Sequence, residues 1–120
     1  MELVALLSSG KGTWGQVAGI VKRQQWEKVV LVCSEFAATK VNEFDFARTA
    51  IIIKTDFDRP ISDVIEDLKK KLQDKFSGME VALSIASGDG KEHMALLSAL
   101  INLPVGIKFV ALTKDGIIEF

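Results

Sequence analysis

The chain has 120 residues, 48% of them hydrophobic and 26% charged, a composition typical of one globular domain and unlike that of disordered chains. Fifteen Lys and Arg against sixteen Asp and Glu give a net charge of −1, which argues against binding duplex nucleic acid by phosphate neutralisation. No apolar run reaches the roughly 18 residues that a membrane helix needs, and the N-terminus lacks the basic flank of a signal peptide. With one cysteine, Cys33, these features predict a cytoplasmic protein that does not bind membranes.

The first half of the chain alternates apolar runs with segments of helical spacing. Residues 3–7 form an apolar run that ends at a glycine-containing loop, and apolar residues at helical spacing follow over residues 14–21. Residues 29–33 and 50–53 are apolar throughout, which indicates strands covered on both faces, as in a parallel sheet. Residues 35–46, between them, have a loosely helical pattern.

The second half continues the alternation and ends in a hairpin. The pattern predicts a helix over residues 61–76, a strand over 81–86, a helix over 91–103, and two strands, 107–112 and 117–120, joined by a turn at Asp115-Gly116. The helix over residues 91–103 carries apolar residues on nearly every side, which in so small a domain favours a homodimer interface.

Strands that alternate with helices imply βαβ units with right-handed crossovers. The sequence therefore predicts a single α/β domain over residues 1–120. Its fold class is a three-layer Rossmann-like domain with a mostly parallel sheet of about six strands and a C-terminal hairpin.

Two glycine-containing loops, residues 8–15 and 87–91, each follow a predicted buried strand and lead into a helix. They are expected at the carboxyl edge of the sheet, where open α/β folds bind ligands, and helix N-termini suit an anion such as phosphate. The alternative is that both are ordinary turns with serine caps. The predicted ligand-binding residues are Ser8, Ser9, Gly10, Lys11, Gly12, Thr13, Trp14, Ser87, Gly88, Asp89, Gly90 and Lys91.

The first loop also has the G-x-G-x-x-G spacing of dinucleotide-binding folds, in Gly10, Gly12 and Gly15. Glu35, at the end of the second predicted strand, is placed to hydrogen-bond a ribose in that alternative. The loop does not match a P-loop, because Gln16 stands where the phosphate-binding lysine belongs.

Other single residues have a functional and a structural interpretation. Trp14 either stacks on a base or packs in the core, and His93 is either a general acid–base group or a solvated helix residue. Asp56 and Asp58 fit helix capping better than cation binding. Cys33 is expected to be an inert packing residue, and the sequence has no His/Cys cluster for zinc.

Two stretches resemble the CRISPR-associated Rossmann-fold (CARF) domains. Residues 7–10, Leu-Ser-Ser-Gly, are similar to the serine- or threonine-bearing ligand loop of that family. Residues 84–91, followed by Met94 and Ala95, look like the family's Asn-x-Thr-Gly-Gly-Thr-Lys stretch and the apolar helix after it. Ser84, Asp89 and one extra residue before Met94 depart from that pattern.

The resemblance implies a standalone CARF-like protein of antiviral defence: a homodimer whose paired loops bind a cyclic oligoadenylate in a symmetric cleft. It implies a sensor, a ligand sink or a ring nuclease that needs no metal or cofactor. In a ring nuclease, Lys91 would neutralise the developing phosphorane, Ser8 or Ser9 would hold the ribose or phosphate, and His93 would be the acid–base candidate. A dinucleotide-binding protein and a non-catalytic regulatory dimer remain as alternatives.

Overall fold

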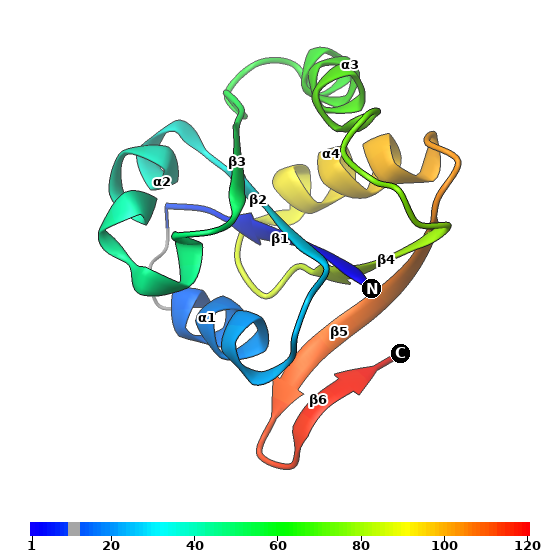
Figure 1. The fold of residues 1–120 in the computed structure, drawn as a ribbon. Helices are drawn as coiled ribbons and strands as arrows, with labels where there is room; N and C mark the ends of the chain where they lie inside the picture. Colours follow the sequence, from blue (N-terminus) through cyan, green and yellow to red (C-terminus); the bar gives the residue numbers. More distant parts are fainter. Residues whose placement is uncertain (10–12) are drawn as a thin grey trace.

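A computed structural model describes residues 1–9 and 13–120, and Figure 1 shows their fold. The strands over these residues are β1 (Glu2–Leu7), β2 (Lys28–Cys33), β3 (Ile51–Lys54), β4 (Glu80–Ser84), β5 (Gly106–Thr113) and β6 (Gly116–Glu119). The α-helices are α1 (Trp14–Arg23), α2 (Glu35–Lys40), α3 (Ile61–Leu72) and α4 (Gly90–Ile101). None of these helices is long and apolar enough to span a membrane.

The strands form one mixed sheet in the order β3-β2-β1-β4-β5-β6. All neighbouring strands from β3 to β5 are parallel, and only β5 and β6 are antiparallel. The predicted α/β class, the mostly parallel six-stranded sheet and the closing hairpin are therefore confirmed.

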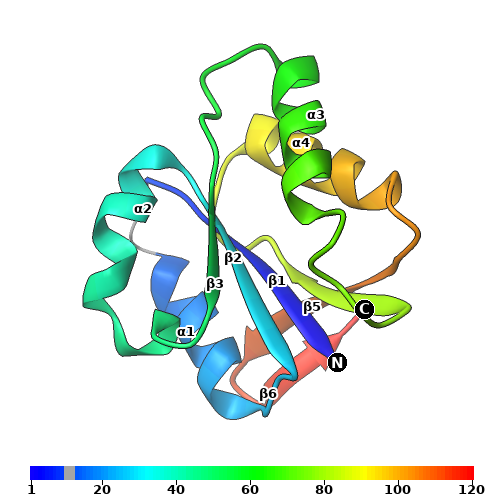
Figure 2. The ribbon, with the colours of Figure 1, turned by 45° about the horizontal axis from the view of Figure 1, so that its top comes forward.

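Helices cover both faces of the sheet, as Figures 1 and 2 show. Alternate side chains of a strand point to opposite faces. In β1, Val4 and Leu6 join the apolar cluster under α3 and α4, whereas Ala5 and Leu7 join the cluster under α1 and α2. Strands buried on both faces explain why their sequences are apolar throughout rather than alternating.

The segment 35–46 differs from the single helix that its spacing predicts. α2 ends at Lys40, and two 3₁₀ turns follow, Val41–Glu43 and Asp45–Ala47. Phe44, between them, has an extended backbone, and its ring packs edge-on against Trp14 with 5.2 Å between ring centroids. Because the backbone at Phe44 is extended, a single helix cannot run through residues 35–46.

The other predicted helices keep their place with shifted ends. The helix expected over 61–76 ends at Leu72, and the one expected over 91–103 runs from Gly90 to Ile101. In the hairpin, Gly116 has a φ of +111°, a conformation that glycine adopts without strain. The predicted turn is therefore present.

At the amino edge of the sheet, Glu2 of β1 connects the start of β2 with the loop before β4. Its carboxylate is buried and accepts hydrogen bonds from the backbone amides of Ser77 (3.1 Å) and Gly78 (2.9 Å), while Lys28 lies 3.5 Å away. Burial would raise the pKa of Glu2, but the two amides and Lys28 outweigh it and hold the pKa below its ordinary value. This buried acid stabilises the edge opposite the predicted ligand loops.

Candidate functional site

A crevice opens at the carboxyl ends of β1 and β4. The chain winds outward from β1 through β2 to β3 and then crosses to β4 on the other side of β1, so the strand order reverses between β1 and β4. Such a switch point leaves a crevice between the two loops that follow the strands. The described parts of both predicted loops lie there, one after Leu7 and one after Ser84.

Ser8 joins the two loops through hydrogen bonds. Its backbone amide donates to Ser87 Oγ at 3.0 Å, and its hydroxyl lies 2.8 Å from both carboxylate oxygens of Glu92. Its carbonyl accepts the indole N–H of Trp14 at 3.0 Å. Ser8 is 6% exposed, so it lies at the bottom of the crevice, where its hydrogen bonds connect the two loops.

Glu92 also completes the start of α4. The Asp89 carboxylate accepts the Glu92 amide at 2.8 Å, and the Glu92 carboxylate accepts the Asp89 amide at 2.9 Å. This reciprocal pair is a capping box. Two carboxylates thus occupy the positive end of α4, where the sequence predicted a phosphate.

Two hollows meet at the Ser8–Glu92 contact. The first, of about 300 Å³, reaches from this contact to the ends of β2 and β3, and we call it the acid-lined hollow. The second hollow, of about 430 Å³, is also lined by Asp89 and Glu92 and reaches toward Thr13, Ala86 and Gly88. The exposed side chain of Ser9 lines both hollows.

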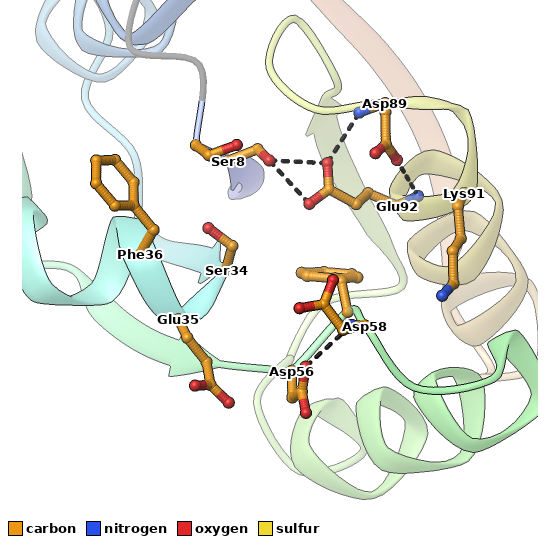
Figure 3. A pocket seen from close by; sticks show the side chains of 11 residues that line it. Ser8, Ser34, Glu35, Phe36, Asp56, Asp58, Asp89, Lys91 and Glu92 are labelled. Atoms are coloured by element: carbon orange, nitrogen blue, oxygen red, sulfur yellow. Dashed lines mark hydrogen bonds between the residues drawn. The ribbon is translucent and has the colours of Figure 1, made fainter.

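Carboxylates dominate the wall of the acid-lined hollow (Figure 3). Among the described residues, Lys91 is the one basic side chain on this wall, and it lies at the far side from Ser8. The rings of Phe36 and Phe57 and the serines Ser9 and Ser34 supply the remaining chemistry. The acids are Glu35, Asp56, Asp58, Asp89 and Glu92.

Lys91 also has a structural contact. Its ammonium donates to the carbonyl of Arg59 at 2.6 Å, and Arg59 in turn pairs with Asp67 at 3.0 Å. Burial would raise the pKa of Asp67, but Lys71 and Arg59 outweigh it and lower this pKa below its ordinary value. Lys91 therefore anchors the start of α4 to the loop before α3.

The remaining predicted site residues are placed as follows. His93 donates from Nε2 to the Ser87 carbonyl at 2.8 Å and lines neither hollow. Trp14 is 3% exposed, so its ring packs in the core and offers no stacking platform. Burial raises the pKa of Cys33 to about 12, as expected of an inert thiol. Gly10, Lys11 and Gly12 lie outside the described residues.

The acidic residues after β3 form a turn. Asp56 Oδ1 accepts the amide of Asp58 at 2.9 Å. Within residues 1–9 and 13–120, no group of three or more His, Cys, Asp or Glu side chains is placed to hold a metal ion.

Three residues that the sequence patterns did not predict also line the crevice: Glu92, Phe36 and Phe57. For Glu92 a signal exists, because an acid three residues after the capping Asp89 marks a capping box. The two phenylalanines have no such signal, since an isolated aromatic residue near a strand end is equally typical of the core.

Comparisons with known proteins assign no family. No protein-family model matches the chain, and no match to it is found among curated proteins. What is established is an α/β fold with a mostly parallel six-stranded sheet.

Proposed function

We propose that the chain binds a nucleotide in the crevice between β1 and β4, and that this nucleotide is a cyclic oligoadenylate held by a homodimer. The observation that carries the proposal is that the loop after β1 and the loop after β4 meet at the switch point through Ser8, Ser87 and Glu92. In open α/β sheets this is where nucleotides bind. The resemblance of the same two stretches to CARF domains supports the cyclic ligand.

The second hollow is the better place for phosphate. It lies toward Thr13, at the start of α1, and the first turn of α1 carries no acidic residue. The carboxylates of Asp89 and Glu92 line the α4 side of this hollow, so we expect the phosphate at its α1 side. Because an anion is favoured at a helix N-terminus that no carboxylate already neutralises, α1 offers the more favourable field.

The apolar face of α4 supports a dimer. Met94 and Ile101 are 57% and 65% exposed. Phe120 is 70% exposed and stacks on Phe109, which belongs to the cluster under α3 and α4, so the hairpin extends the same face. α4 starts at the crevice, and a two-fold axis beside its first turn would bring two crevices together.

The proposal is binding without catalysis. The three residues predicted for ring opening do not share one hollow: Lys91 lines the acid-lined hollow, Ser9 lines both hollows and His93 lines neither. Lys91 and His93 are also engaged with backbone carbonyls. A cleavage role for these residues stays a prediction, which chromatography of the recovered ligand tests.

The dinucleotide alternative has less support. In the G-x-G-x-x-G fingerprint the last glycine allows close packing of helix and strand. At Gly15 an added Cβ would meet nothing within 4 Å, so Gly15 is not needed for packing. A Gly15→Ala variant should fold normally, and any loss of NAD affinity in it would then reflect the ligand site.

Isothermal titration of the purified protein with cyclic tetra-adenylate, cyclic hexa-adenylate and NAD tests the proposal. We expect one cyclic oligoadenylate to bind with one ring per two chains. Ser9→Ala should weaken binding about tenfold, because a hydrogen bond to a charged phosphate is lost. Ser62→Ala, an exposed serine on α3, is the matched control and should bind as the wild type does. Binding of NAD alone, or of no nucleotide, would overturn the proposal.

A further inference from the structure

We infer that the acid-lined hollow takes the nucleoside half of the ligand, with a ribose hydroxyl donating to Ser8, and that it excludes phosphate. The inference rests on the proposed nucleotide-binding function and deepens it, because it assigns the two halves of the ligand to the two hollows. It follows from the hydrogen bonds of Ser8, the charges on the wall and the two aromatic rings.

Ser8 presents an acceptor to the crevice. A serine hydroxyl has one proton and two lone pairs. The proton is directed to the Glu92 carboxylate, 2.8 Å from each oxygen, and Glu92 is only 6% exposed. The Ser8 amide and carbonyl are engaged with Ser87 and Trp14. What remains on the hydroxyl is lone-pair capacity, which accepts a hydrogen bond from a ligand and cannot donate one to a phosphate oxygen.

The wall of the acid-lined hollow also favours hydrogen-bond donors over phosphate. Glu35 and Asp58 are exposed carboxylates at opposite sides of the opening, and Figure 3 shows them with Asp56 around the same space. Five carboxylates against one lysine give a field that repels a phosphate group. Hydroxyl and amino groups are the donors that carboxylates and a serine lone pair can bind.

Two rings give the hollow an apolar side. Phe57 is 7% exposed and packs in the cluster under α3, whereas Phe36 is 43% exposed on α2. Both line the hollow. Apolar and aromatic side chains are typical of pocket walls against which a ligand such as a base packs. A volume of about 300 Å³ lies at the lower end of the usual range for small-molecule sites and suits one nucleoside.

Amide NMR titrations with adenosine, 2′-deoxyadenosine, 3′-deoxyadenosine and inorganic phosphate test the assignment. We expect adenosine to shift the amides of Ser34, Glu35 and Asp58, and at least one deoxy analogue to bind about tenfold more weakly. Inorganic phosphate should leave these three amides unshifted and act at Ser9 and Thr13. Adenosine binding that is equal to that of both deoxy analogues, or phosphate shifts around Asp58, would overturn the inference.

A Glu92→Gln variant tests the role of Ser8 directly. The carboxamide can donate to the Ser8 hydroxyl, which frees the serine proton for the hollow and removes one negative charge, so inorganic phosphate should now shift the amide of Ser34. If this variant does not fold, Asp58→Asn tests the charge instead: it should let inorganic phosphate shift the amide of Ser34, while Asp115→Asn in the hairpin turn should not. Failure of either expected change in a folded variant counts against the inference.

The two proposals fail in different ways. If cyclic oligoadenylates bind but phosphate, and not adenosine, shifts the amides of the acid-lined hollow, the inference is wrong and the proposed function stands. If neither adenosine nor any nucleotide shifts an amide of the crevice, both are wrong.

Discussion

At the level of single residues, Glu92 connects the two loops that form the crevice. One carboxylate caps α4 and binds the Ser8 hydroxyl, so it fixes the loop after β4 against the loop after β1. A buried carboxylate with hydrogen bonds to both of its oxygens is favourable, whereas the same group without partners would cost several kcal/mol. The geometry of the site therefore depends on Glu92, although a carboxylate cannot itself bind an anionic ligand.

Gly88 is the residue whose replacement should damage this arrangement most directly. Its φ is +105°, and a Cβ there would overlap Leu6 and lie 3.2 Å from His93 Nε2. We expect Gly88→Ala to lower the free energy of unfolding by about 1–3 kcal/mol because of the strained backbone and the overlap. Chemical denaturation measures the change.

Gly90 is the matched control for Gly88. It is the first residue of α4, and a Cβ there would meet nothing within 4 Å. Gly90→Ala should leave stability unchanged or raise it by up to about 1 kcal/mol. Equal destabilisation by both substitutions would contradict the assignment of strain to Gly88.

Glu2 should make stability depend on pH. Its pKa is lower in the folded chain than its ordinary value of 4.5, because the amides of Ser77 and Gly78 and the charge of Lys28 favour the carboxylate despite burial. A lowered pKa gives stability that is present above about pH 4.5 and lost as the pH falls through the folded value. Glu2→Gln should therefore cost about 1–3 kcal/mol at pH 7 and much less at pH 3.

Denaturation curves of the wild type and Glu2→Gln at the two pH values provide the measurement. Glu119→Gln, on the exposed part of β6, should keep the wild-type pH dependence. A stability difference between Glu2→Gln and the wild type that is the same at pH 3 and pH 7 would rule out the ionic role of Glu2.

At the scale of elements, the capping box decides where α4 begins. Asp89→Ala removes the acceptor for the Glu92 amide and should lower the free energy of unfolding by about 1 kcal/mol. Asp89→Asn keeps an oxygen acceptor and should lose only a small part of that stability. If chemical denaturation gives Asp89→Ala and Asp89→Asn the same free energy of unfolding, the side-chain oxygen at position 89 contributes no measurable capping stability.

The element order could be predicted from the sequence because the central strands β1, β2 and β4 are buried on both faces. Apolar runs such as residues 29–33 have no other simple explanation, and a parallel sheet follows from their alternation with helices. The segment 35–46 was mispredicted because Phe44 and Phe46 pack against α1, a tertiary contact that spacing does not reveal.

The chemistry of the crevice was harder to predict than its position. Glycine loops after strands predicted the carboxyl edge of β1 and β4, where the described parts of both loops lie. The acidic wall was not predicted, because Glu35, Asp58 and Asp89 come from three separate segments. These three acids lie around one hollow because of the order of the strands in the sheet, and that order cannot be read from the sequence pattern.

For the whole molecule, the outer face of α4 should control assembly. Its exposed residues Met94 and Ile101 are uncharged and apolar, whereas α3 exposes Asp63, Glu66 and Lys70. Interface cores are depleted of charge, so α4 and not α3 fits a contact with a second copy. Met94→Glu should convert a dimer to a monomer in light scattering, while Lys70→Glu on α3 should not. A wild-type monomer at high concentration would contradict the dimer.

The most direct test of nucleotide binding is thermal unfolding of the wild-type protein alone and with cyclic tetra-adenylate, cyclic hexa-adenylate, NAD or ATP. A ligand at a hundred times its dissociation constant stabilises the folded state by about 2.7 kcal/mol, which raises the Tm of a domain of this size by several degrees. We predict such a rise with one cyclic oligoadenylate. An unchanged Tm with all four ligands would contradict a nucleotide site in the crevice.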